Sequence, residues 1–364
     1  MSINEIIIYI MAVFAVLGAV DRIIGNKIGL GNQFEEGILA IGTLALSMVG
    51  IITLSPVIAS VLEPFVVPVF NMLGADPAMF AGSILANDMG GAPLAFELAG
   101  SKEAAQFGGL IVGSMLGPTI VFTLPVALGL IKEHDRKYMA TGVLAGVITI
   151  PFGSLAGGIV AGFPFIMIVR NLIPIIIFAV AIAFGLWKFP NGMIKGFTVF
   201  GKFIVILITA GLILGISEEL TGFTLIQGLN PLSDGFEIVA DISIVLAGAF
   251  PLVFAITKIF KKPLLKLGKL LGMNDVSAAG LVASLANSIP MFNMVNDMDN
   301  KGKIINFAFA TSAAFVFGDH LGFTAGFDSS MIFPMIVGKL TGGVTAVILA
   351  LFLAKGLKGE INGD

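Results

Sequence analysis

The chain has 364 residues, of which 57% are hydrophobic and only 12% are charged, and its formal net charge is −3. This composition excludes a soluble globular domain, and the slightly negative charge argues against a nucleic-acid partner. Cysteine is absent, which excludes disulfides and thiol chemistry. The composition therefore predicts an all-α integral membrane protein that has the lipid bilayer as a partner.

Apolar runs long enough to cross a bilayer, each of roughly 20 residues, predict about nine spanning helices. The first run has no basic residues before it, so it is interpreted as a retained helix and not as a cleaved signal peptide. A shorter apolar piece at 63–75 is expected near the membrane interface, and a basic amphipathic piece at 261–272 corresponds to it. In chain order, the expected spans cover residues 3–24, 37–62, 106–131, 138–162, 164–187, 194–216, 238–260, 304–327 and 329–354.

The segment 77–98 is apolar, but it is broken at its centre. Asn87 and Asp88 are polar, two glycines follow shortly after them, and Pro93 lacks a backbone donor. An aspartate in the middle of a bilayer costs ~2.5–3.5 kcal/mol even on insertion scales. Such a break is tolerated only where the backbone and the carboxylate face protein or a water-filled cavity.

A second broken segment, 276–298, repeats the Leu-Ala-Asn tripeptide of the first. Its Asn287 is followed by Ser288 and then by Pro290. Two broken membrane segments at matching places in the two halves of a chain indicate the binding site of a transporter.

Short sequence matches relate the two halves at an offset that stays between 198 and 201 residues. Matches in the same order at a nearly constant offset indicate an internal repeat. The first repeat is assigned to residues 1–162, a connecting helix to 163–190 and the second repeat to 191–364. The matched positions are Pro64 with Pro263, Leu73-Gly74 with Leu271-Gly272, Ala81-Gly82 with Ala279-Gly280, Leu85 with Leu285, Gly117 with Gly318, and Phe122-Thr123 with Phe323-Thr324.

Charged loops predict the orientation of the chain in the membrane. Basic loops at 132–137, 188–195 and 258–269 are expected on the cytoplasmic side, and an acidic loop at 218–237 outside. A tail that ends inside, where its lysines belong, requires the second broken segment to enter the membrane and return. The same course for the first segment puts 63–75 outside and its basic counterpart, 261–272, inside. Each leg of about 10 residues gives ~15 Å of helix, which reaches the midplane. The sequence therefore predicts two re-entrant hairpins and an inverted-topology repeat.

Polar side chains inside the apolar segments are the candidate substrate-binding residues. In an inverted repeat, matched positions such as Asn87 and Asn287 face each other near the midplane. Two carboxylates there favour a cation, while amides and hydroxyls favour a ligand with hydroxyl or amine hydrogens. No catalytic, metal-binding or cofactor-binding residue is predicted. The candidates are Asp88, Asp319, Asn87, Asn287, Ser288, His320 and Thr119.

Each candidate also has a purely structural interpretation. Asp88 could cap the helix that follows the break. Asp319 and His320 could form a pair whose members satisfy each other. The amides and hydroxyls could serve only the backbone groups that the breaks leave free.

Several long strings of this sequence are similar to one known family. The strings are QFEEG from Gln33, DMGG from Asp88, GSMLGPTIVF from Gly113, GVLAG from Gly142, ANSIPMF from Ala286, GDHLGF from Gly318 and MIFPMIVGKLTGGVTA from Met331. Over nearly its whole length the chain resembles the EutH family, the ethanolamine permeases of bacterial ethanolamine-utilisation operons. The resemblance implies a multi-pass transporter that imports ethanolamine across the cell inner membrane.

Ethanolamine suits the predicted site physically. Its amine is protonated at neutral pH, as the head group of lysine is, so the charged form crosses lipid slowly. Asp88 or Asp319 is expected to pair with the ammonium, and amides, hydroxyls and His320 to supply further polar contacts. The expected partner is this small-molecule substrate, and a homo-oligomer is compatible with the sequence.

Two other functions stay open at this point. An ion-coupled carrier of another small amine or amino acid would have the same kind of site. An intramembrane aspartyl protease also needs two buried aspartates, and Gly318-Asp319 resembles part of such a site. However, Val316 stands where that pattern needs a glycine.

Overall fold

Helices make up nearly all of the described chain, and no strand occurs in that part. The computed structural model describes residues 1–356, without the side chains at 260, 261, 264, 267, 269, 355 and 356. Within it, eight helical stretches are long and apolar enough to cross a membrane. They are Ile3–Ile23, Leu30–Met72, Lys102–Leu130, Glu133–Val160, Phe165–Lys188, Pro190–Thr221, Leu232–Ile259 and Ser329–Ala354. The prediction of an all-α integral membrane protein is confirmed.

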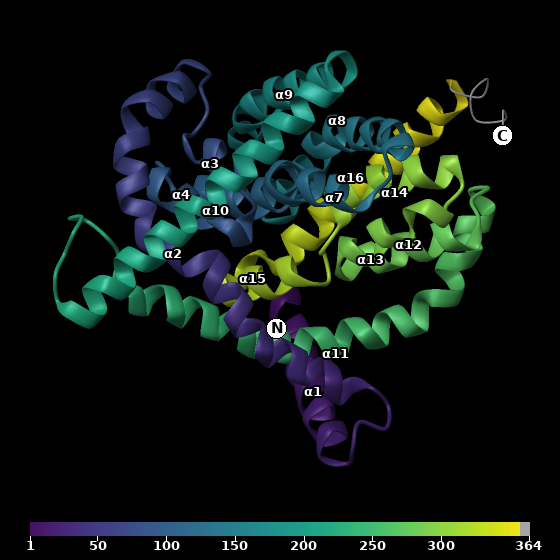
Figure 1. The fold of residues 1–364 in the computed structure, drawn as a ribbon, viewed down its shortest axis with the longest axis horizontal. Helices are drawn as coiled ribbons and strands as arrows, with labels where there is room; N and C mark the ends of the chain where they lie inside the picture. The colour runs from purple at the N-terminus through teal and green to yellow at the C-terminus, as the bar shows by residue number, and fades with distance from the viewer. Residues whose placement is uncertain (357–364) are drawn as a thin grey trace.

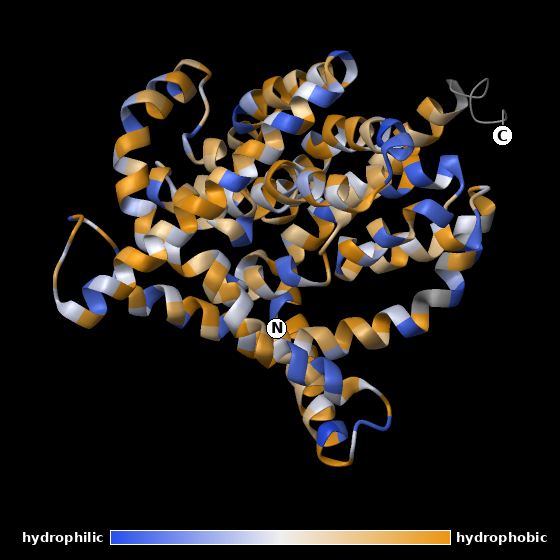
Figure 2. Cartoon of the chain, in the orientation of Figure 1, coloured by the Kyte–Doolittle hydropathy of each residue, from blue (hydrophilic) through white to orange (hydrophobic). Residues whose placement is uncertain are grey.

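The long helices pack in two groups (Figure 1). In the first, α1 (Ile3–Ile23), α2 (Leu30–Met72) and α11 (Leu232–Leu270) contact one another. In the second, α8 (Arg136–Val160), α14 (Asn300–Ala313) and α16 (Ile332–Gly356) do the same. Two further helices lie against these groups, α9 (Phe165–Lys188) on α8 and α10 (Pro190–Thr221) on α2. Figure 2 shows hydrophobic residues along the helices and hydrophilic residues mostly at helix ends and in loops.

Glycines allow these helices to approach closely. A Cβ atom added at Gly50 would lie 1.8 Å from the carbonyl oxygen of Ile208, and one at Gly211 would lie 2.1 Å from that of Gly50. Between α8 and α16, a Cβ at Gly153 would lie 2.6 Å from the Gly338 carbonyl oxygen. Larger residues cannot occupy these positions without moving a backbone, so the many glycines set the helix spacing.

The short pieces predicted at 63–75 and 261–272 are not separate elements. The first mostly continues α2, with Pro64 and Pro68 inside the helix, and the second mostly continues α11, with Pro263 inside it. A proline removes one backbone hydrogen bond, but ending the helix in an apolar medium would free several. The helix therefore runs on through the proline.

The span predicted at 304–327 is interrupted. It consists of α14 and α15 (Asp319–Phe327), separated by an irregular stretch at 314–318. In that stretch Phe315 has a positive φ of 63°. Its backbone N–H and that of Phe317 donate to the carbonyl oxygens of Ser284 (3.0 Å) and Leu285 (2.9 Å). The backbone groups that this interruption frees are thus bonded to the end of α12 (Asp275–Ala286).

The two segments predicted to be broken are broken in the structure. In the first, α3 (Ala78–Ile84) and α4 (Gly91–Leu98) pack against each other, with the short 3₁₀ turn η1 (Asn87–Met89) between them. In the second, α12 packs against α13 (Ser288–Met294), and Asn287 stands between them. Their re-entrant course in a membrane stays a prediction.

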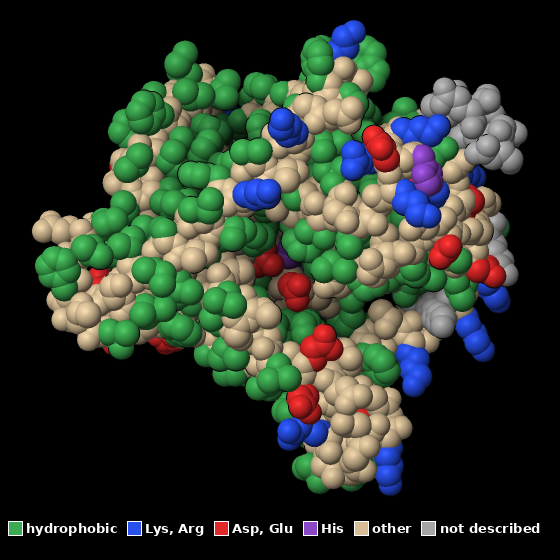
Figure 3. Space-filling model, viewed as in Figure 1, with side chains coloured by type: hydrophobic (Ala, Val, Ile, Leu, Met, Phe, Trp, Pro, Cys, Tyr) green, Lys and Arg blue, Asp and Glu red, His purple; other side chains and the backbone are tan. Residues whose placement is uncertain are grey.

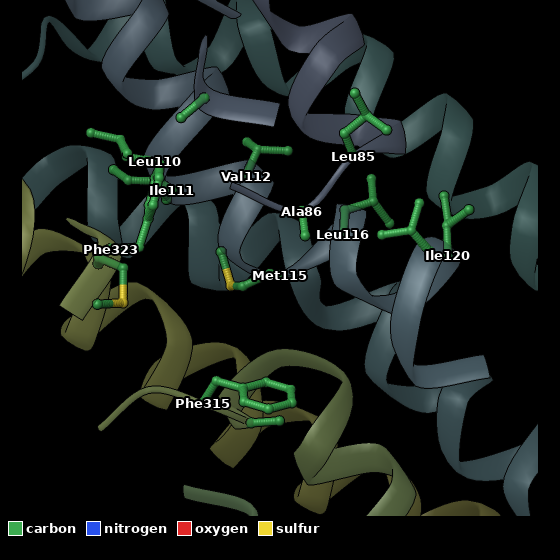
Figure 4. Close-up of a cluster of buried hydrophobic side chains, with 14 of the residues drawn as sticks. Leu85, Ala86, Leu110, Ile111, Val112, Met115, Leu116, Ile120, Phe315 and Phe323 are labelled. Atoms are coloured by element: carbon green, nitrogen blue, oxygen red, sulfur yellow. The ribbon is translucent and has the colours of Figure 1, made fainter. Parts of the chain in front are cut away.

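A close contact recurs at matching places in the two halves. A Cβ at Gly117, in the three-residue helix α6 (Leu116–Pro118), would lie 1.9 Å from the carbonyl oxygen of Leu85. A Cβ at Gly318 would lie 2.0 Å from that of Ala286. In both halves, the glycine matched by the repeat therefore lies against the break of that half. Figure 4 shows this region, with Leu85, Ala86 and Leu116 on one side and Phe315 and Phe323 on the other.

Several short helices lead from the first break towards α8. They are α5 (Lys102–Gln106), the π-helical turns η2 (Phe107–Ile111) and η4 (Thr119–Thr123), the 3₁₀ turn η3 (Val112–Ser114) and α7 (Leu124–Leu130). Together with α6 they form the irregular stretch that the sequence predicted as a span at 106–131.

Candidate functional site

The first break brings Asp88 into the interior. Leu85 and Ala86 are extended, and Gly90 closes the turn with a φ of 93°. A Cβ at Gly90 would lie 2.3 Å from Ile51 of α2, so this turn needs glycine for both its φ and its space. The Asp88 side chain at the centre of the turn is 18% exposed.

The interruption of the second half brings His320 to the same place. His320 is the second residue of α15 and is buried. Its Nε2 lies 3.9 Å from Oδ1 of Asp88, so α15 and η1 face each other through these two side chains. The ring of Phe315, from the interruption itself, lies 5.2 Å from the imidazole ring, centre to centre.

Asp319 is assigned to the same site because its charge acts on Asp88. The charges of Asp88 and Asp319 act on each other, and Glu36 of α2 acts on Asp319. Figure 3 shows acidic side chains in a hollow at the centre of one face, with a histidine deeper inside. This charge effect agrees with the predicted convergence of the two carboxylates, which stays a prediction.

Lys339 is a member of the site that the sequence analysis did not identify. It lies on α16, only 1% of it is exposed, and its Nζ lies 3.0 Å from His320 Nδ1. The same Nζ donates to the carbonyl oxygen of Ser114 in η3. The signal in the sequence is a single lysine inside a long apolar run, which in a membrane segment indicates a functional residue. Asp88, Asp319, His320 and Lys339 are called the central site below.

Two predicted polar residues are buried without hydrogen-bond partners among the described residues. Neither amide atom of Asn87 has one, and neither has the hydroxyl of Ser288. Both residues are fully buried, where an unsatisfied polar group costs about 1–3 kcal/mol. Asn87 directly precedes Asp88, so its amide is free to serve a ligand or water there.

Two other predicted residues have structural partners. The Asn287 amide oxygen accepts from the backbone N–H of Ile289 (2.8 Å) and so caps α13. Asn287 also lines a mostly apolar cavity of about 500 Å³ together with Phe254 and Thr257. The Thr119 hydroxyl lies 3.0 Å from the carbonyl oxygen of Met115, and Thr119 is fully buried. Within the described part, no hydrogen bond joins either of these residues to the central site.

Comparison with known proteins gives the family. A family described as "Ethanolamine utilisation protein, EutH" matches residues 3–353. The chain belongs to the EutH family. It is 66% identical to a protein of Listeria monocytogenes named "Probable ethanolamine permease EutH", over 92% of this chain and 90% of that protein. The Escherichia coli protein of the same name is 51% identical, over 92% and 91% of the two chains.

A further relative, the "Uncharacterized protein YxeR" of Bacillus subtilis, is 47% identical over 91% of this chain and 90% of its own length. No solved structure matches the chain. Membership of the EutH family confirms the resemblance seen in the sequence. Because the named relatives are permeases and eight apolar helices are present, the chain is a multi-pass membrane protein of the transporter class, consistent with the bacterial inner membrane.

Proposed function

We propose that this EutH protein imports protonated ethanolamine and binds its ammonium group between Asp88 and Asp319. The observation that carries the proposal is the 3.9 Å approach of His320 to Asp88, because it joins the broken segment of the first half to the interrupted helix of the second half in one polar site. The names of the relatives, at up to 66% identity, support ethanolamine as the substrate.

The charges of the central site favour a cation. The central site holds two carboxylates and one lysine. Glu36, which is not a member of the site, adds the electrostatic effect of a third carboxylate on Asp319. The surrounding core is apolar and densely packed, so an excess of negative charge is costly until a cation enters. A small ammonium supplies that charge and can donate to both carboxylates.

The hydroxyl of ethanolamine needs a neutral polar partner. Asn87 offers an amide oxygen and an amide nitrogen, both without a partner among the described residues. An amide can accept from the hydroxyl or donate to it. Asn87 therefore supplies the contact that distinguishes ethanolamine from a simple alkylamine, and Asn287, Ser288 and Thr119 remain more distant candidates.

Alternating access follows from the proposed inverted repeat. The repeats at 1–162 and 191–364, joined by the connection at 163–190, would carry one broken segment each. Movement of one hairpin-bearing unit against the rest would open the central site to each side in turn. The substrate would then cross without a continuous pore.

Uptake of labelled ethanolamine into proteoliposomes tests the proposal. Asp88→Asn and Asp319→Asn remove one carboxylate each and are expected to lower uptake by at least roughly tenfold, the cost of losing a charged hydrogen bond. Asp234→Asn, at an exposed position, is the matched control and is expected to transport normally. Normal transport by both site variants would refute the assignment, and a preference for another amine in competition would refute the substrate.

A further inference from the structure

The environment of Lys339 is unusual for a buried lysine. Its Nζ donates to the carbonyl oxygen of Ser114 and lies 3.0 Å from Nδ1 of His320, which accepts when the imidazole proton is on Nε2. Among the described residues, no carboxylate is close enough to form an ion pair with it. A buried ammonium is costly to keep when its only direct contacts are neutral. Some other charge must stabilise the protonated form.

Burial disfavours the charged form of Lys339, and the negative charge that opposes this effect is that of Asp88, across the imidazole ring. Asp88 acts electrostatically on Lys339, and it faces the opposite ring nitrogen of the histidine that Lys339 contacts. The charged and titratable groups that face Lys339 are thus Asp88 from η1 and His320 from α15, and Asp319 directly precedes His320 in α15. The central site thus contains a row of three side chains that runs from η1 to α16: Asp88, His320 and Lys339.

Ethanolamine at Asp88 competes with Lys339 for the same negative charge. This step rests on the proposed function, which places the substrate ammonium beside Asp88. A second positive charge at the other end of one imidazole ring repels the Lys339 ammonium, and a dry interior screens this repulsion weakly. Binding of the cation therefore favours the loss of the Lys339 proton.

We propose that Lys339 is the proton-coupling residue of the carrier and that it gives up one proton when ethanolammonium binds. In the empty site, Nζ donates to His320 Nδ1, which leaves the imidazole proton on Nε2 beside Asp88. On binding, a proton passes from Nζ to Nδ1, and the Nε2 proton leaves to water at the partly exposed Asp88. The N–H bonds at Nζ and Nε2 break, an N–H bond forms at Nδ1, and an O–H bond forms on the water that takes the proton. The site thus gains one positive charge with the substrate and loses one with the proton.

Calorimetry of ethanolamine binding in buffers of different ionisation enthalpy measures the number of protons released. The protein is the full chain in detergent or nanodiscs, and the ligand is ethanolamine hydrochloride adjusted to the pH of the protein. Wild type is expected to release about one proton per bound ethanolamine, because the change in bound protons is linked to the binding equilibrium.

Two substitutions of Lys339 distinguish the effect of its releasable proton from the effect of its positive charge. Lys339→Arg keeps the positive charge but cannot release a proton, so it is expected to release almost none and to bind ethanolamine at least about tenfold more weakly. Lys339→Met is the second variant, to be used if arginine disturbs folding, because methionine fits the apolar surroundings. It is expected to release fewer protons than wild type. Lys202→Gln, at an exposed lysine, is the control and is expected to behave as wild type.

The outcomes separate this inference from the proposed function. Binding of ethanolamine by wild type without proton release overturns the inference alone. Proton release that is unchanged in a folded Lys339→Arg or Lys339→Met protein also overturns it, because the proton then comes from another group. Absence of ethanolamine binding by wild type overturns the proposed function and the inference together.

Discussion

His320 Nε2 lies 3.9 Å from Asp88 Oδ1, although the two residues belong to opposite halves of the chain. Each follows an interruption of regular helix, at 85–86 for Asp88 and at 314–318 for His320. A polar pair between two interruptions is an arrangement that regular helices crossing the membrane independently would not produce. Transport by this EutH protein is therefore expected to depend on the contact between His320 and Asp88.

Replacement of His320 is expected to abolish most transport. His320→Phe keeps a planar ring but removes both nitrogens, so Asp88 and Lys339 lose the group between them. The loss of the hydrogen bond between Lys339 and His320 costs about 1.5–3 kcal/mol, which corresponds to roughly tenfold or more in uptake rate. The measurement is initial uptake of labelled ethanolamine in proteoliposomes.

The only other histidine in the sequence supplies the control for this experiment. The side chain of His134 is 67% exposed, so His134→Phe is expected to leave uptake close to wild type. Equal uptake by the two variants would show that His320 only fills space.

Gly318 and Gly117 are expected to be essential for stability, because each lies against the break of its own half. A Cβ atom would lie 2.0 Å from a carbonyl oxygen at Gly318 and 1.9 Å at Gly117, and neither backbone can retreat easily. Gly318→Ala and Gly117→Ala are expected to lower the free energy of unfolding by about 1–3 kcal/mol or more. Thermal unfolding in detergent measures this change.

Gly129 is the matched control for the glycine substitutions. It lies in α7, and a Cβ added to it meets nothing within 4 Å. Gly129→Ala is expected to be neutral or slightly stabilising, since alanine favours helix over glycine. A melting temperature for Gly318→Ala as high as that for Gly129→Ala would contradict the packing argument.

Most of the spans could be predicted from the sequence, because a bilayer imposes a length and an apolar composition on any helix that crosses it. The break at Asp88 could be predicted for a related reason, because a carboxylate inside an apolar membrane segment is energetically costly. The interruption at 314–318 could not, because four of its five residues are apolar and its positive φ falls on Phe315. Tertiary hydrogen bonds to Ser284 and Leu285 stabilise that conformation.

The site was predicted in part for a related reason. Asp88, Asp319 and His320 stand out as polar residues in apolar segments, and the structure brings Asp88 and His320 together, with Asp319 directly before His320 in α15. Lys339 stands out less, because a lysine one or two turns inside a span can extend its side chain to the membrane surface. Only the packing of α16 against α15 and η2 shows that this side chain points inwards. Conversely, sequence could not show that Thr119 and Asn287 have backbone partners.

The Asp135–Lys303 ion pair is expected to contribute strongly to stability. Lys303 Nζ lies 2.6 Å from Asp135 Oδ1, and the two side chains are 7% and 0% exposed, respectively. Asp135→Asn leaves a buried lysine without its partner and is expected to cost about 3–5 kcal/mol. The double variant Asp135→Leu/Lys303→Met removes both charges and is expected to recover most of that loss in a thermal unfolding assay. A double variant as unstable as Asp135→Asn would show that packing, not charge, matters there.

The inverted orientation of the two halves can be tested at the ends of two long helices. Met72 ends α2 and Leu270 ends α11, and they are 87% and 85% exposed. These ends lie next to the matched Leu73-Gly74 and Leu271-Gly272 pairs. An inverted repeat puts equivalent positions on opposite sides of the membrane, and the charged loops predict Met72 outside and Leu270 inside.

Because the chain has no cysteine, single-cysteine variants report these positions without background. Met72→Cys in intact cells is expected to react with a membrane-impermeant maleimide, whereas Leu270→Cys is expected to react only after the membrane is permeabilised. Both residues are similarly exposed in the structure, so a difference in labelling reports the side of the membrane on which each lies and not its burial. Labelling of both from the same side would mean that the halves run parallel, and alternating access by two mirrored hairpins would then have no structural basis.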